Sequence, residues 1–373
     1  VIGHLGTPDG DDAAALLDEA GPAFLPTDEI GLSGLQRTFQ RELAGRPGGR
    51  IELYEPATGD VTHRLVEMKP RAGTPVKTTL SLEIQTAAES AVVGAEKPTA
   101  VVAVRSSTGE ILAAAGGPGV TPFNRGFEGK YPPGSTFKVL TAATLLENGM
   151  TINDRVTCPA TVSVGGKRFT NAGDQARPDG PFVDAFAHSC NSTIVARAES
   201  VTGDDLTAMA QRFGIGEKWD LGLPAFSGSV PDPGDLVDRA ATMIGQGRVL
   251  TSPLGMAMVA AAVESGRPRT PTLLTDRRSR PLAALSPELR RDLTALMRAV
   301  VTRGSARQVL SGVPGAIHAK TGTAEYVAGN GIRTHAWMIG FRDDLAFAVV
   351  IEDGGAGGKD AGPIARRFLQ SVG

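Results

Sequence analysis

The stretch Tyr131-Pro132-Pro133-Gly134-Ser135-Thr136-Phe137-Lys138 decides how this chain is organised. Two prolines and a glycine oppose a helix before Ser135, because proline fixes φ and glycine leaves the backbone loose. The apolar segment that follows ends at Asn148-Gly149 and predicts a buried helix of about three turns. Ser135 and Lys138 are its polar exceptions, and their i, i+3 spacing places both side chains on one face of the helix.

This pair has the chemistry of an activated nucleophile. A lysine side chain has an ordinary pKa of about 10.4 and must lose its proton before it can act as a base. Burial among Phe137, Val139 and Leu140 penalises the ammonium and lowers its pKa, and a second cation nearby lowers it further. A neutral Lys138 could then deprotonate Ser135. The same spacing also fits a capping serine followed by a surface lysine, so this motif alone does not decide between the two.

Two further motifs follow downstream. Ser189-Cys190-Asn191 stands between helix-like segments at 182–188 and 193–201, and Lys320-Thr321-Gly322-Thr323 lies in a strand-like stretch at 316–326. Ser-x-x-Lys, Ser-x-Asn and Lys-Thr-Gly in this order are typical of penicillin-binding proteins and serine β-lactamases. The chain resembles a class B penicillin-binding protein of actinobacterial-like composition.

The resemblance runs continuously from about residue 75 to residue 373 and includes stretches outside the three motifs. These are Asn124–Gly129, Gly245–Gly247, Thr251–Leu254 and His335–Phe341. Gly31–Leu35 and the helix-like segment after it resemble the pedestal that precedes the catalytic domain in this class.

The resemblance implies a role for each polar residue of the motifs. Ser135 is expected to be the nucleophile and Lys138 its base. Ser189 is expected to relay a proton towards the leaving amine, while Lys320 supplies positive charge that keeps Lys138 neutral. Asn191 is expected to hold Lys138 and the peptide backbone of the substrate.

The last motif is expected to hold the substrate. Backbone N–H groups of Ser135 and Thr323 would form the oxyanion hole. Thr321, Gly322 and Thr323 would bind the terminal carboxylate, since the two threonines share a strand face at period two. The same pleat places Lys320 on the opposite face of the strand. A long side chain or a strand twist must therefore bring its amine to the site.

The substrate class also follows from the resemblance. Family members acylate on a peptidoglycan stem that ends in D-Ala-D-Ala, release D-Ala, and transfer the acyl group to an amine of a neighbouring stem. β-Lactams would imitate that terminus and trap Ser135. A glycosyltransferase of the cell-wall machinery is an expected partner, and no metal or organic cofactor is implied.

Three alternatives share these residues. A D,D-carboxypeptidase would use water as the acceptor, although the pedestal and the Thr-Ala-Glu after Lys320-Thr321-Gly322 favour a transpeptidase. A serine β-lactamase would need an added deacylating carboxylate, for which the chain offers no clear candidate. A β-lactam sensor or a cell-wall scaffold would be acylated without turnover.

Composition excludes several other classes. A net charge of −2 and a pI of about 6.3 do not suggest a nucleic-acid surface. No apolar run approaches the length of a membrane span. The family resemblance implies an N-terminal signal anchor before Val1, which would place the chain at the extracytoplasmic face of the bacterial membrane.

The 373 residues suggest two domains. Residues 1–70 are expected to form a small α+β pedestal with helices at 11–19 and 32–43, and residues 71–373 the transpeptidase domain. Two early strands and three late strands predict one antiparallel five-stranded sheet, with an all-helical subdomain inserted at about 140–310. The strands are expected at 100–106, 110–115, 317–324, 335–341 and 345–352. The fold class is thus α+β, an α/β/α sandwich.

The cysteines and glycines carry less information. Cys158 and Cys190 are expected to be two free, mostly buried thiols, with a disulfide as the less favoured reading. The five histidines are scattered without ligand spacing, which gives no metal site. The glycine-rich stretch 354–358 lacks the spacing of a phosphate loop and is interpreted as a plain turn.

Overall fold

The computed structural model describes residues 1–118, 123–329 and 331–373. The chain divides into two compact units, Val1–Thr78 and Thr79–Gly373. The division falls a little beyond the boundary predicted after residue 70, because the last strand of the first unit extends to Met68 and an extended segment follows it.

The first unit is built from short elements. They are β1 (Leu5–Gly6), α1 (Ala13–Ala20), β2 (Ile30–Gly31), α2 (Gly34–Thr38), α3 (Gln40–Ala44), β3 (Gly49–Tyr54) and β4 (Val61–Met68). The single helix predicted at 32–43 is wrong, since Phe39 leaves helical geometry with φ −110° and ψ 27°. The break turns Gln40 inward, where its Oε1 accepts from the Gly31 N–H at 2.8 Å, and leaves Leu43 exposed.

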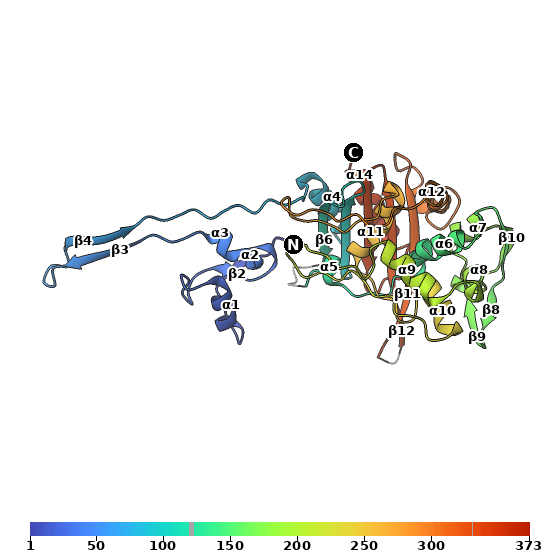
Figure 1. Ribbon diagram of the computed structural model, residues 1–373, viewed down its shortest axis with the longest axis horizontal. Helices are drawn as coiled ribbons and strands as arrows, with labels where there is room; N and C mark the ends of the chain where they lie inside the picture. The colour runs from blue at the N-terminus through green and yellow to red at the C-terminus, as the bar shows by residue number, and fades with distance from the viewer. Residues whose placement is uncertain (119–122, 330) are drawn as a thin grey trace. The chain divides into compact units, whose positions relative to one another are not determined.

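The second unit is organised around one antiparallel sheet (Figure 1). Its strand order is β11 (His318–Ala328), β12 (Gly331–Arg342), β13 (Leu345–Ile351), β5 (Thr99–Arg105), β6 (Ile111–Gly117). The late strand β13 pairs with the early strand β5, with Val349 opposite Val101. The predicted five-stranded sheet closed by the two ends of this unit is therefore confirmed. Strand β11 forms one edge, and this edge carries the Lys320 motif.

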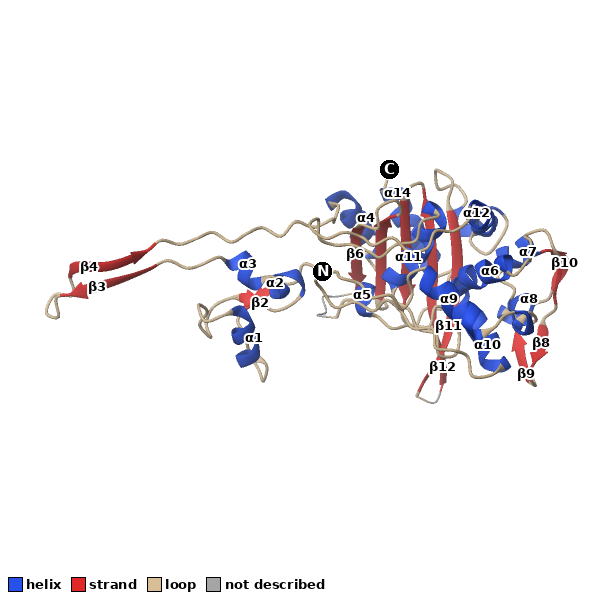
Figure 2. Ribbon diagram, in the orientation of Figure 1, coloured by secondary structure: helices blue, strands red, loops and turns tan. Residues whose placement is uncertain are grey.

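Helices cover both faces of the sheet, which gives the predicted sandwich (Figure 2). Helices α4 (Leu82–Val92) and α14 (Ala361–Ser371) pack together on one face, and α11 (Pro253–Ser265) packs on β5 and β13 from the other. Leu82, the first residue of α4, is 83% exposed. At 3.6 residues per turn, Leu82 lies opposite the buried Ala88 and Ala91.

The inserted block contains helices and four short strands. Its helices are α6 (Lys138–Glu147), α7 (Phe182–Ala187), α8 (Asn191–Val195), α9 (Gly203–Arg212), α10 (Leu236–Met243), α11, α12 (Pro287–Thr302) and α13 (Arg307–Leu310). Its strands are β7 (Arg155–Cys158), β8 (Thr161–Val164), β9 (Lys167–Thr170) and β10 (Arg177–Pro181). The prediction of an all-helical insert is therefore wrong. Gly165 and Gly166, at φ 54° and 81°, make the tight turn that pairs β8 with β9.

Cys158 and Cys190 form a disulfide, so the prediction of two free thiols is wrong. Strand β7 ends at Cys158 and packs against α8, whose first residue follows Cys190. This packing brings the two Cα atoms to 6.2 Å. A contact between segments so far apart in sequence leaves no periodic signal.

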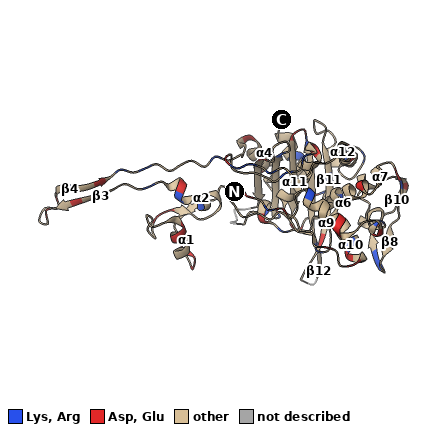
Figure 3. Ribbon diagram, in the orientation of Figure 1, with Lys and Arg blue, Asp and Glu red and all other residues tan. Residues whose placement is uncertain are grey.

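Charges of both signs are interspersed along the described part of the chain (Figure 3). This distribution agrees with the near-neutral net charge of −2. Among the described residues, no helix has the length and apolar character needed to cross a bilayer.

Candidate active site

The turn that carries Ser135 lies directly against β11. Ser135 lies in a single 3₁₀ turn at Gly134–Phe137 that continues into α6. Gly134 has φ 53°, and a Cβ there would lie 2.5 Å from the Thr323 carbonyl oxygen. On the strand, a Cβ on Gly322 would lie 2.8 Å from Thr136 Cγ2. The two glycines therefore allow the Ser135 turn and the edge strand to approach each other closely.

Lys138 is fully buried at the start of α6. Its Nζ lies 2.6 Å from Asn191 Oδ1, 2.7 Å from the Ser189 carbonyl oxygen and 3.4 Å from Ser189 Oγ. Burial first, and then the nearby Lys320 charge, lower the pKa of Lys138 well below its ordinary value. Burial and a nearby cation are the two causes that the sequence predicted.

Lys320 reaches the same serine from the sheet. Its side chain is buried, its Nζ donates to Ser189 Oγ at 2.8 Å and to the Thr321 carbonyl at 2.9 Å, and it lies 5.6 Å from the centre of the Phe186 ring. Burial lowers the pKa of Lys320 to about 7. The long side chain thus resolves the pleat conflict, because it carries the Lys320 amine to Ser189 in the helical block.

Ser189 is the junction between the two lysines. It lies between α7 and α8 with φ 59°, a left-handed conformation that is uncommon for a residue other than glycine. This backbone directs both its carbonyl and its hydroxyl to Lys138. Such outliers persist where the surrounding structure enforces them, and they concentrate at functional sites. No feature of the sequence predicts this conformation.

Asn171 supports the second motif and was missed by the sequence analysis. Its Oδ1 accepts from the backbone N–H groups of Asn191 (2.8 Å) and Ser192 (3.0 Å), and its Nδ2 donates to the carbonyls of Pro159 and Gln175. Asn191 in turn donates from Nδ2 to the Thr170 carbonyl at 2.8 Å. A single asparagine in a loop gives no recognisable pattern, so only its contacts reveal this role.

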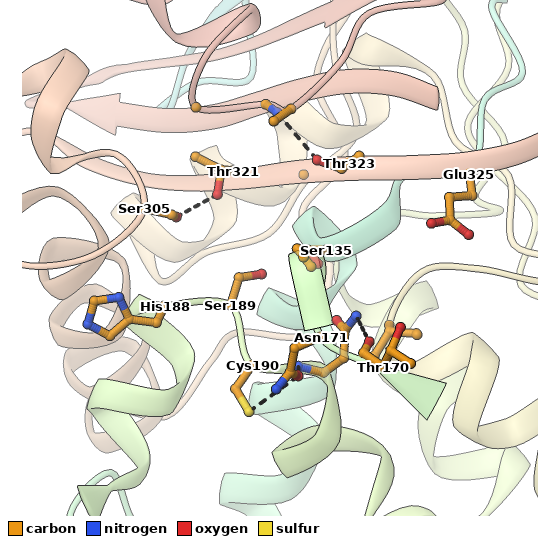
Figure 4. A pocket seen from close by; sticks show the side chains of 18 of the residues that line it. Ser135, Thr170, Asn171, His188, Ser189, Cys190, Ser305, Thr321, Thr323 and Glu325 are labelled. Carbon is orange, nitrogen blue, oxygen red and sulfur yellow. Dashed lines mark hydrogen bonds between the residues drawn. The ribbon is translucent and has the colours of Figure 1, made fainter. Parts of the chain in front are cut away.

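The remaining predicted residues lie on β11 (Figure 4). The hydroxyls of Thr321 and Ser305 are 2.6 Å apart, and Thr323 Oγ1 accepts from the Gly357 N–H at 3.4 Å. Gly357 belongs to the glycine-rich turn, which therefore supports the strand as a structural element.

One groove of about 1380 Å³ collects these groups. Its lining includes Ser135, Ser189, Asn191 and the stretch Thr321–Thr323. Lys138 and Lys320 lie buried beneath it. The structure thus brings all the predicted site residues together: a groove-facing hydroxyl beside two buried amines with lowered pKa values. This arrangement suits acyl transfer to a serine.

Comparisons with known proteins agree with this geometry. Residues 99–370 match the family model of the penicillin-binding protein transpeptidase domain. The peptidoglycan D,D-transpeptidase PbpA of Mycolicibacterium smegmatis is 34% identical over 367 residues, covering 81% of this chain and 73% of that protein.

Two solved structures extend the likeness. Penicillin-binding protein A from M. tuberculosis, as a ceftriaxone acyl-enzyme complex, superposes with a TM-score of 0.74 at 28% identity, over 82% of this chain and 81% of that one. A chain of a peptidoglycan synthase complex that coordinates polymerisation and crosslinking superposes with a TM-score of 0.81 at 26% identity, over 93% of this chain and 71% of that one. The chain belongs to the penicillin-binding protein transpeptidase family and is a D,D-transpeptidase of the class B type.

Proposed function

We propose that Ser135 acylates on a peptidoglycan stem ending in D-Ala-D-Ala and that the acyl group passes to an amine of a neighbouring stem. The observation that carries the proposal is the convergence of Lys138 and Lys320 on the Ser189 hydroxyl beside Ser135. It supplies a neutral base, a retained positive charge and a proton relay within one groove.

The hydrogen bonds of Lys138 can be made by a neutral amine. Its two N–H groups are directed to the Ser189 carbonyl and to Asn191 Oδ1. The lone pair of the nitrogen is then free to accept a proton. Ser189 Oγ receives an N–H from Lys320, so its own proton can point to Lys138 at 3.4 Å.

Acylation begins with attack by Ser135. Ser135 Oγ bonds to the carbonyl carbon of the penultimate D-Ala while its proton passes to Lys138. The tetrahedral oxygen accepts from the N–H groups of Ser135 and Thr323. As the C–N bond breaks, Ser189 donates its proton to the departing D-Ala amine and receives the proton held by Lys138.

Transfer reverses the proton path. The acceptor amine loses a proton through Ser189 to Lys138 as it attacks the acyl-enzyme, and Ser135 recovers its proton when the ester bond breaks. Thr321, Gly322 and Thr323 hold the terminal carboxylate of the donor at the Lys320 end of the groove, where positive charge favours it. Because β-lactams present a similar carboxylate and amide, they acylate Ser135 in the same way.

We assign the first unit a structural role as a pedestal. The likeness to the synthase-complex chain extends over 93% of this chain and supports an association with a glycosyltransferase of the cell-wall machinery. We place the catalytic unit at the extracytoplasmic face of the membrane, held by an N-terminal anchor, because its substrate lies there.

A donor and acceptor assay tests the proposal. A stem-peptide thiolester serves as donor and a D-amino acid as acceptor amine, and mass spectrometry follows the products. We expect the transferred amide with wild type and none with Ser135→Ala. Hydrolysed donor alone would indicate a carboxypeptidase, and a lasting acyl-enzyme without either product would indicate a sensor.

A further inference from the structure

We propose that Glu325 forms a subsite for a cationic side chain on the donor residue that precedes the terminal D-Ala-D-Ala. The inference rests on the proposed function and adds to it a preference among donor stems. Glu325 lies outside the three motifs, and its backbone contacts the side chain of Gln246.

Gln246 identifies the groups that line the open edge of β11. Its side-chain amide donates to the Glu325 carbonyl at 3.0 Å and accepts from the Glu325 N–H at 3.1 Å. Both backbone groups of Glu325 therefore point away from β12. Because these groups alternate in direction along an antiparallel strand, those of Thr321 and Thr323 also point to the open edge.

The donor peptide must run antiparallel to β11 along this edge. Its reacting carbonyl lies between the N–H groups of Ser135 and Thr323, and its carboxylate lies towards Thr321 and the Lys320 charge. The chain on the N-terminal side of that carbonyl therefore runs towards Glu325. A strand advances about 3.3 Å per residue, so the residue before the acylated D-Ala comes level with Ala324, and a long side chain on that residue can extend one position further to Glu325.

Gln246 prevents backbone pairing of the donor with Glu325, since it already occupies both backbone groups of that residue. Contact between the donor and Glu325 must then come from side chains. The carboxylate of Glu325 is exposed and lines the groove. It makes no hydrogen bond or ion pair with any residue in the described ranges. Figure 4 shows its side chain leaving β11 on the side where Ser135 lies.

The surrounding charge makes this position distinctive. Most charged residues that line the groove are basic: Lys167, Arg168, Arg177, Lys359, Arg366 and Arg367. Apart from Glu325, the described lining contains one other acid, Asp174, which follows Asn171 in the opposite wall. A groove of this composition suits an anionic stem peptide, and Glu325 offers an ammonium a partner at one point on the edge strand.

The test uses two thiolester donors that differ at a single group. Both carry an acylated lysine before D-Ala and a thiolactate leaving group, one with a free ε-ammonium and the other with an ε-acetamide. We expect wild type to prefer the ammonium by about threefold to fivefold in kcat/KM, the range of a partly exposed ion pair, and added salt to reduce the preference. Glu325→Gln should remove the preference by slowing only the ammonium donor.

Glu83→Gln, on α4 outside the groove, is the matched control and should retain the preference. Glu325→Lys should invert it. A preference unchanged in Glu325→Gln would overturn the proposal, and so would an equal loss with both donors. An effect confined to the transfer step would also overturn it, because it would place Glu325 beside the acceptor amine.

Penicillins separate this proposal from the function on which it rests. Ampicillin carries an ammonium on its acyl side chain and benzylpenicillin does not, and intact-protein mass reports the acylation rate without turnover. We expect Glu325→Gln to slow ampicillin and to leave benzylpenicillin unchanged. If no thiolester turns over while both penicillins acylate, the proposed transfer fails and the penicillin pair still decides the role of Glu325.

Discussion

Lys320 donates a hydrogen bond from Nζ to the Ser189 hydroxyl at 2.8 Å, and so links the edge strand to the helical block. The same hydroxyl lies 3.4 Å from Lys138 Nζ. The serine is held between a retained charge and a base, which is the arrangement that a proton relay requires.

Removal of this hydroxyl is the first prediction. Ser189→Ala should slow acylation by benzylpenicillin about 10² to 10⁴-fold, the contribution of a positioned acid or base. The second-order rate constant from intact-protein mass measures the effect. Ser163→Ala, at an exposed position of β8, should acylate at the wild-type rate. A Ser189→Ala rate within twofold of wild type would remove the relay from the mechanism.

The second prediction concerns pH. Acylation needs Lys138 neutral and Lys320 charged, so the rate should fall when Lys138 gains a proton at low pH and when Lys320 loses one above pH 7. The alkaline limb follows from the pKa of Lys320, which burial lowers to about 7. A profile of acylation rate against pH should be bell-shaped.

Lys320→Met provides the matched test of that profile. Loss of the Lys320 charge removes a cause that lowers the pKa of Lys138. The acid limb should therefore move to higher pH, and the limb near pH 7 should disappear. An unshifted acid limb in this variant would show that the two lysines are not coupled.

The third prediction tests Asn171 as a positioning residue. Asn171→Ala leaves the N–H groups of Asn191 and Ser192 without their acceptor in a buried loop. An unsatisfied buried group costs about 1–3 kcal/mol, so the free energy of unfolding should fall by that amount. The benzylpenicillin acylation rate should also fall, because Asn191 holds Lys138. A loss of stability with an unchanged rate at low temperature would confine Asn171 to a structural role.

The fourth prediction concerns the disulfide. Cys158 and Cys190 are separated by 32 residues, and closing a loop of that size stabilises a fold by about 3–4 kcal/mol in the chain-entropy model. Reduction should lower the free energy of unfolding in urea by up to that amount. The Cys158→Ala/Cys190→Ala double variant should not respond to reductant. Equal stability of wild type with and without reductant would contradict the assignment.

The sequence predicted the sheet and the three motifs because their signals are local. Apolar runs mark β5 and β13, and the spacing from Ser135 to Lys138 places two side chains on one face. Contacts between distant segments gave no such signal. The disulfide, the support from Asn171 and the left-handed Ser189 arise only when β7, α7 and α8 pack together.

The hairpin in the inserted block could have been predicted from the sequence. Gly165 and Gly166 form a two-residue hairpin turn, and the glycine pair between β-prone residues could have predicted β8 and β9. The roles of the site residues stay predictions that the experiments above address.

The most direct test of the account is intact-protein mass after incubation with benzylpenicillin, for wild type and for Ser135→Ala. We expect one lasting adduct of the drug's mass on wild type and none on Ser135→Ala, with Ser163→Ala behaving like wild type. An adduct on Ser135→Ala, or none on wild type at high drug concentration, would contradict Ser135 as the nucleophile. Rapid loss of the adduct with hydrolysed drug would indicate a β-lactamase.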